Sequence, residues 1–190
     1  FRVGGVETGV VDLTRSLVKL GHKVVVVSNG GDLVRDIESG GALHYQLPVH
    51  KKSLFSIIGL IPKLTEIIRK ENIEIVHARS RVPAWIAYFA SRRARVIFIT
   101  TCHGYYKKHL FSQVMGWAKR VIAISNVIAR HMVDDFQVPR DKIRLIPRSV
   151  DLERFRYSAL SEKKGEDFHV GIIGRITPIK GHLHFIKAMA

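Results

Sequence analysis

The sequence has little of what marks disulfide-rich, membrane-spanning or metal-binding proteins. It contains one cysteine, Cys102, so no disulfide can form within the chain, and a reducing, cytoplasmic setting is favoured. No apolar run approaches the roughly 18 residues that a membrane-spanning helix needs. The spacing of His, Cys, Asp and Glu matches no metal-site pattern, and we expect neither a metal nor another cofactor.

Acidic and aromatic residues are also scarce. Sixteen Asp and Glu face 31 Lys and Arg, which gives a net charge of +15. This balance favours an anionic partner, which is a nucleic acid, a phosphate-rich substrate or an acidic membrane surface. Aromatic residues make up only 8% of the chain, and no stacking cluster or recognition motif for nucleic acid is present. A basic nucleic-acid-binding domain stays an alternative, but we expect no nucleic-acid partner.

Helical spacing of apolar residues alternates with short β-branched runs. Helices are expected at 6–20, 32–39, 54–70, 83–91, 110–118 and 127–136, and strands at 24–27, 43–47, 73–77, 96–101, 120–124 and 143–146. Gly21 is expected to close the first helix, Ser125 to cap the last, and Pro62 to kink the third. This alternation predicts an α/β fold with a Rossmann-like, doubly wound parallel sheet.

The polar stretch at 158–167 is the best candidate for a linker between domains. Residues 1–157 are expected to form one Rossmann-like domain that lacks its first strand. Residues 168–190 are expected to begin a second such domain, with a strand at 169–173 and then a turn and a helix. Because the chain does not start with Met and stops inside a helical pattern, we expect a fragment of a longer protein.

Ligands of doubly wound folds bind at the carboxyl ends of the strands, beside helix N-termini. Gly4 and Gly5 lie where the first predicted helix begins, and glycine there permits close backbone approach to a phosphate. An ordinary glycine turn is the alternative, and no GxGxxG fingerprint occurs in the chain, which counts against a dinucleotide oxidoreductase. His103 follows a predicted strand and is a candidate hydrogen-bonding or proton-handling group. A solvated loop histidine is the alternative.

Two cations lie on a glycine-flanked turn near the end of the sequence. Arg175 follows Gly174, and Lys180 precedes Gly181 just before a predicted helix. Such a pair suits a diphosphate on which leaving-group charge develops. A solvated turn is the alternative, but a cation at a helix N-terminus opposes the macrodipole, and this mismatch favours a functional role.

Five separated motifs carry a family resemblance. They are Gly-Gly-Val-Glu at 4–7, His103-Gly104, Ala123-Ile124-Ser125, the segment 146–155, and Gly174-Arg175 with Lys180-Gly181. Together and in this order they resemble glycosyltransferase family 4, whose members are retaining enzymes with the GT-B fold. The resemblance covers essentially the whole chain.

This resemblance implies transfer of a sugar from a nucleotide-sugar donor to a glycan or lipid-linked acceptor, in the synthesis of cell-envelope polysaccharide or lipopolysaccharide. His103 would contact the transferred sugar, and the two cations would neutralise the diphosphate as it leaves, without a metal. The residues that it assigns to donor binding are Gly4, Gly5, Gly174, Arg175 and Lys180, with a position near the acceptor as the alternative for the glycine pair. It implies His103, Arg175 and Lys180 as the catalytic residues.

The chain departs from the family pattern in two places. Residues 147–151 read Pro-Arg-Ser-Val-Asp where the family commonly has Pro-Asn-Gly-Val-Asp, which adds the cation Arg148. The family's donor-side glutamate pair would lie beyond Ala190, so we expect these 190 residues to be inactive alone. A nucleotide-sugar epimerase, which can share the two-domain architecture, is an alternative.

Basic clusters adjoin apolar residues in several places. Lys51 and Lys52 come just before Leu54 and Phe55, for example. An apolar helix face with flanking cations can lie on an anionic membrane surface, whereas a core-facing helix with solvated ends is the alternative. With the lipid-linked acceptors that the resemblance implies, we expect a cytoplasmic protein that can sit peripherally on the inner face of the membrane.

Overall fold

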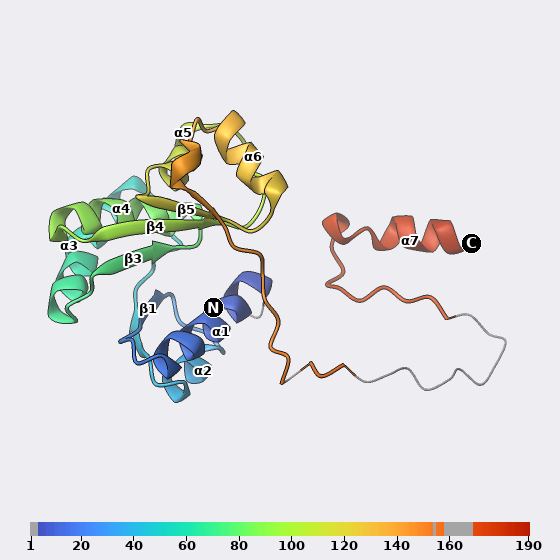
Figure 1. Cartoon of the computed structure of the whole chain (residues 1–190), viewed down its shortest axis with the longest axis horizontal. Helices are drawn as coiled ribbons and strands as arrows, with labels where there is room; N and C mark the ends of the chain where they lie inside the picture. The colour runs from blue at the N-terminus through green and yellow to red at the C-terminus, as the bar shows by residue number, and fades with distance from the viewer. Residues whose placement is uncertain (1–3, 154, 158–168) are drawn as a thin grey trace. The chain divides into compact units, whose positions relative to one another are not determined.

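The computed structural model describes residues 4–153, 155–157 and 169–190. The chain divides into two compact units, residues 1–151 and 152–190 (Figure 1). The linker predicted at 158–167 lies outside the described residues, so that prediction stays open.

The first unit alternates helices with short strands. Its helices are α1 (Gly5–Lys19), α2 (Val34–Ser39), α3 (Leu54–Lys70), α4 (Arg81–Ala94), α5 (Leu110–Gln113) and α6 (Asn126–Asp134), with 3-10 turns η1 (Val114–Gly116) and η2 (Arg140–Lys142). Its strands are β1 (Val25–Ser28), β2 (Leu43–Gln46), β3 (Ile75–Ala78), β4 (Ile97–Cys102), β5 (Arg120–Ala123) and β6 (Ile143–Leu145). Each predicted element of this unit is present, and α3 continues as one helix through Pro62.

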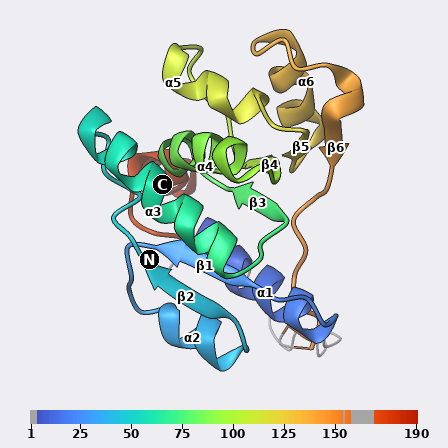
Figure 2. The ribbon, with the colours of Figure 1, turned by 90° about the vertical axis from the view of Figure 1, so that its left-hand side faces the viewer.

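All strand pairs are parallel, but they form two sheets. β1 pairs with β2, and the second sheet has the order β3-β4-β5-β6. The predicted α/β class and parallel strands are therefore confirmed. Within the described residues no ladder joins β1 to β3, so each of these strands has one edge without a strand neighbour (Figure 2).

Local signals in the sequence explain where the helices end and begin. Gly21 has a φ of +82°, which glycine adopts without strain, and its N–H donates to the carbonyl of Val18 at the end of α1. The Oγ of Ser125 accepts from the N–H of Ile128 at 3.3 Å and caps α6. Both predicted caps are confirmed.

The main core lies around the four-stranded sheet. α3 packs on α4, and α4 packs on β3 and β4 (Figure 2). Side chains with no exposed surface include Ile86, Val114, Met115, Val121 and Met132. This packing fixes the carboxyl edge of the sheet, from which the loops of the candidate site emerge.

The second unit contains η3 (Pro178–Lys180) and α7 (His182–Met189). The strand predicted at 169–173 is not formed, and the side chain of Ile173 is fully exposed. A strand needs a neighbour for its N–H and C=O groups, and the described part of residues 152–190 contains no other strand. The prediction of this strand was therefore wrong for this structure.

Candidate functional site

Three side chains emerge at the carboxyl edge of the four-stranded sheet. Arg79 directly follows β3, His103 directly follows β4, and Arg148 comes soon after β6. Because the strands are parallel, their carboxyl ends lie at the same edge. The position of His103 directly after a predicted strand had indicated it as a site residue. The same criterion applies to Arg79, which was missed because no motif marked it.

The predicted glycine pair forms the start of α1. Gly4 is the N-cap in extended conformation, Gly5 is the first helical residue, and no side chain caps the helix. A Cβ atom on Gly5 would lie 3.0 Å from Nη1 of Arg148. A larger residue at this position would push the guanidinium away, so glycine permits the close approach of Arg148 to the helix start.

His103 lies beside Arg148 and is neutral at physiological pH. Its pKa is lowered to about 4 by burial and by the nearby charges of Arg79 and Arg148, with a smaller effect of His77. Nη2 of Arg148 lies 3.5 Å from Nδ1 of His103, and a guanidinium can only donate. Nδ1 is then the acceptor and Nε2 carries the hydrogen. Nε2 is buried and has no partner among the described residues, so it can donate to a bound ligand.

A second histidine holds the loop that carries His103. Nδ1 of His131 donates to the Asp135 carboxylate at 2.6 Å, and its Nε2 accepts from the backbone N–H of Tyr106 at 3.1 Å. The hydroxyl of Tyr106 in turn accepts from the backbone N–H of His103 at 3.4 Å. The His131 ring also lies 4.3 Å from that of Tyr105, between ring centroids. These contacts fix the loop after β4 against α6.

We expect His131→Leu to loosen this loop and to lower the free energy of unfolding by about 2 kcal/mol, because the Tyr106 N–H loses its buried acceptor. Hydrogen exchange at the amides of 103–109 should become faster. Chemical denaturation and exchange measure the two effects. His50→Leu, at an exposed position, is the control. Equal exchange in both variants would contradict the bracing role.

Histidines with a lowered pKa also make the free energy of unfolding depend on pH. Nε2 of His77 lies 2.7 Å from Oγ1 of Thr101, and burial, with a smaller effect of Arg79, lowers the pKa of His77 to about 4. The unfolded chain binds this proton near pH 6.5 and the folded chain only near pH 4. The free energy of unfolding should therefore fall as the pH drops from about 6.5 to 4, by about 3 kcal/mol from His77.

Urea unfolding at several pH values tests this expectation. His77→Gln should reduce the decline by the share of His77, about 3 kcal/mol, since glutamine does not titrate, while His103 with its pKa of about 4 continues to contribute. His22→Gln removes an exposed histidine and should leave the slope unchanged. A wild-type slope that survives in His77→Gln would show that other groups cause it.

The second unit holds the two predicted cations. Arg175 and Lys180 are both exposed. A Cβ atom on Gly174 would lie 3.7 Å from Cγ of Lys180, so the lysine stem packs over this glycine. On the same turn, Oγ1 of Thr177 and Nδ1 of His182 are buried without a partner among the described residues. These two groups are free to bind a ligand, and no motif in the sequence had marked them.

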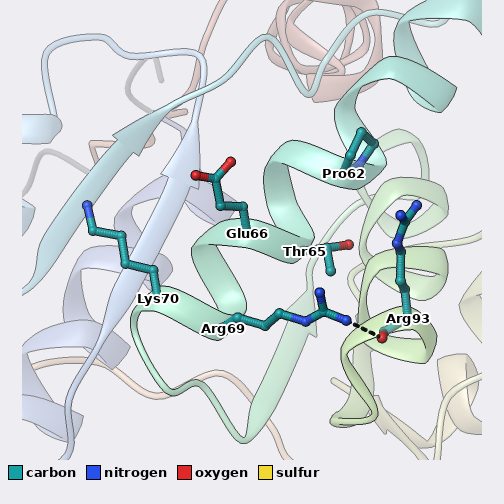
Figure 3. Close-up of a pocket in the computed structure, with 6 residues that line it drawn as sticks. All are labelled: Pro62, Thr65, Glu66, Arg69, Lys70 and Arg93. Atoms are coloured by element: carbon teal, nitrogen blue, oxygen red, sulfur yellow. Dashed lines mark hydrogen bonds between the residues drawn. The ribbon is translucent and has the colours of Figure 1, made fainter.

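A hollow of about 280 Å³ lies between α3 and α4, apart from the predicted residues (Figure 3). Nη2 of Arg69 donates to the backbone carbonyl of Arg93 at 3.1 Å, close to the end of α4. A cation there complements the negative end of the helix dipole, so the contact has a structural explanation. The residues that line the hollow are Pro62, Thr65, Glu66, Arg69, Lys70 and Arg93.

The thiol of Cys102 is buried and is not activated. Burial raises the pKa of the Cys102 thiol to about 12, which keeps it protonated and a weak nucleophile. In residues 4–153, 155–157 and 169–190, no three His, Cys, Asp or Glu side chains gather closely enough to hold a metal ion. None of the helices described there has the length and apolar character needed to span a bilayer.

Comparisons with known proteins agree with this fold. The chain is similar to the gpi3 subunit of phosphatidylinositol N-acetylglucosaminyltransferase from Schizosaccharomyces pombe, with 25% identity over 97% of this chain and 48% of that protein. It is also similar to the Escherichia coli UDP-Gal:alpha-D-GlcNAc-diphosphoundecaprenol alpha-1,3-galactosyltransferase, with 28% identity over 72% of this chain and 41% of that enzyme. The chain thus spans about half the length of the curated relatives it matches.

A solved structure and a family model also match this chain. A crystal structure of a glycosyltransferase from Rickettsia africae superimposes with a TM-score of 0.80 and 33% identity, over 98% of this chain and 53% of that one. The family model of Glycosyltransferase Family 4 matches residues 3–154, which include the glycine pair, His103 and Arg148. The chain therefore belongs to glycosyltransferase family 4.

Proposed function

We propose that the protein containing this chain transfers a sugar from a nucleotide-sugar donor to a lipid-linked or glycan acceptor, with retention of configuration. The observation that carries the proposal is the meeting of the Gly4-Gly5 helix start with His103 and Arg148 at the carboxyl edge of the sheet. Family membership supports the reaction class. The name of the Escherichia coli relative includes UDP-Gal and a diphosphoundecaprenol acceptor, which supports a role in cell-envelope polysaccharide or lipopolysaccharide synthesis.

The roles follow from the chemistry of each group. The uncapped start of α1 offers N–H groups to a phosphate. The Nε2–H of His103 donates to a hydroxyl of the transferred sugar. Arg175, Lys180 and Gly174 bind the donor diphosphate, and the two cations replace a metal in stabilising the leaving group.

A transfer assay tests the function. The protein, extended to the length of its relatives, is incubated with UDP- and GDP-sugars and with lipid diphosphate or phosphatidylinositol acceptors. We expect a glycosylated acceptor in which NMR shows the anomeric configuration of the donor, and no turnover by the 190-residue chain alone. An epimerase would instead change the sugar of the nucleotide without any acceptor. Inversion of the anomeric centre would refute retention.

We further propose that this protein binds peripherally to an anionic membrane, on its cytoplasmic face. The pattern Lys-Lys-x-Leu-Phe occurs at 51–55 and again at 107–111, and each copy leads into a helix, α3 or α5. The apolar pair is exposed in both copies. The side chain of Phe55 is 88% exposed and that of Leu110 is 81% exposed. Cations beside exposed apolar side chains suit the boundary between headgroups and acyl chains.

Vesicle sedimentation tests the membrane proposal. We expect Phe55→Ser combined with Leu110→Ser to reduce binding to phosphatidylglycerol vesicles about tenfold or more, because two exposed apolar anchors are lost. Val127→Ser, at a 55% exposed site on α6, is the control. Binding by the double variant as strong as that of the control would refute this surface.

A further inference from the structure

Two arginines of the first unit lie along one side of α1. A Cβ atom on Gly5 would meet Nη1 of Arg148 at 3.0 Å, and one on Gly9 would meet Nη2 of Arg79 at 3.2 Å. Residues four apart share a helix face, about 6 Å apart along the axis. The two glycines therefore let both guanidiniums approach the first turns of the helix, one turn apart.

Neither guanidinium is neutralised by the described part of the chain. The ion pairs found there join Arg15 to Asp36 and Lys23 to Glu71. Arg79 is in addition desolvated. Its Nε is buried without a described partner, and burial, together with the charge of Arg148, lowers its pKa. Two like charges that are close together and lack a carboxylate favour an anion between them.

We propose that Arg79 and Arg148 bind a phosphate group of a substrate. This inference rests on the proposed transferase function and is separate from the roles of Arg175 and Lys180. Guanidinium forks donate two parallel hydrogen bonds to phosphate oxygens, which an ammonium cannot do. His103 is neutral and adds no further positive charge. The site thus provides two guanidinium groups, a set that suits a phosphate ester.

Two substrates of the proposed reaction can bring such a group. One is the nucleotide donor with its diphosphate, and the other is an acceptor whose lipid is attached through a phosphate. The shared chemistry is a phosphate ester bound at the carboxyl edge of the sheet. Competition between the two kinds of ligand distinguishes the sources.

Titration of the 190-residue chain with inorganic phosphate, by calorimetry at low and constant chloride, tests the site directly. We expect Arg148→Gln and Arg79→Gln each to weaken phosphate binding about tenfold or more. Arg148→Lys, which keeps the charge but not the fork, should fall in between. Arg140→Gln removes an exposed cation on η2 and should bind as wild type does. Circular dichroism confirms that each variant is folded.

A second experiment tests whether UDP or farnesyl diphosphate displaces the bound phosphate. Displacement by UDP alone assigns the site to the donor, and displacement by farnesyl diphosphate alone assigns it to the acceptor. Either result supports the site. Phosphate affinity that is equal in Arg79→Gln, Arg148→Gln and Arg140→Gln would overturn it, whatever the transfer assay shows. Loss of transfer with phosphate binding intact would count against the proposed function only.

Discussion

Alanine at Arg175 or at Lys180 is expected to lower kcat for sugar transfer by about 10²- to 10³-fold in the protein extended to the length of its relatives. Negative charge builds on the diphosphate as the bond to the sugar breaks. A cation that meets this charge stabilises the transition state more than the ground state, so kcat falls while KM changes little. Both side chains are exposed and have no carboxylate partner in the described residues, so they are free to bind a ligand.

The matched control for this pair is Lys187→Ala, an exposed lysine on α7 of the same unit. Because Arg175 and Lys180 would act on one leaving group, the double variant should lose less than the product of the two single effects. Steady-state kinetics with saturating acceptor measures kcat and KM for the donor. Wild-type kcat in both single variants would exclude this turn from the donor site.

Local patterns predicted most elements of the first unit because each was decided by a few neighbouring residues. α3 begins at Leu54 and ends at Lys70 as its periodicity predicts, and Ser125 caps α6. Pairing between strands is a long-range property, and apolar runs do not encode it. The sequence therefore could not show that β1 and β3 are unpaired with each other, or that residues 169–173 lack a strand partner.

The candidate site was predictable only in part, for a related reason. His103 was a candidate because it directly follows a predicted strand. The start of α1 was a candidate because two glycines lie where the helix begins. Contacts between distant parts of the chain had no such signal. His103 and Arg148 are 45 residues apart, and Arg79 reaches Gly9 from a different loop. Their meeting depends on the order of β3, β4 and β6 in one parallel sheet.

Substituting His103 tests whether this residue acts as a hydrogen-bond donor or as a proton-transfer group. Its pKa near 4 leaves it neutral from pH 5.5 upward, so it is a poor general base at neutral pH. We expect His103→Ala to reduce kcat/KM about 10²-fold, the usual loss when a donor to the reacting sugar is removed. His103→Gln should lose less of kcat/KM than His103→Ala does, because the glutamine amide can donate from nearly the position of Nε2.

The pH profile separates the two roles more sharply than the loss of rate does. A donor that stays neutral adds no inflection to kcat/KM between pH 5.5 and 8, so His103→Gln should have the same profile as wild type at a lower level. A general base with an ordinary pKa near 6.5 would instead cause a rise through that value, and the rise would vanish in His103→Gln. Such an inflection would mean that burial and the charges of Arg79 and Arg148 do not depress the pKa of His103 in the working enzyme.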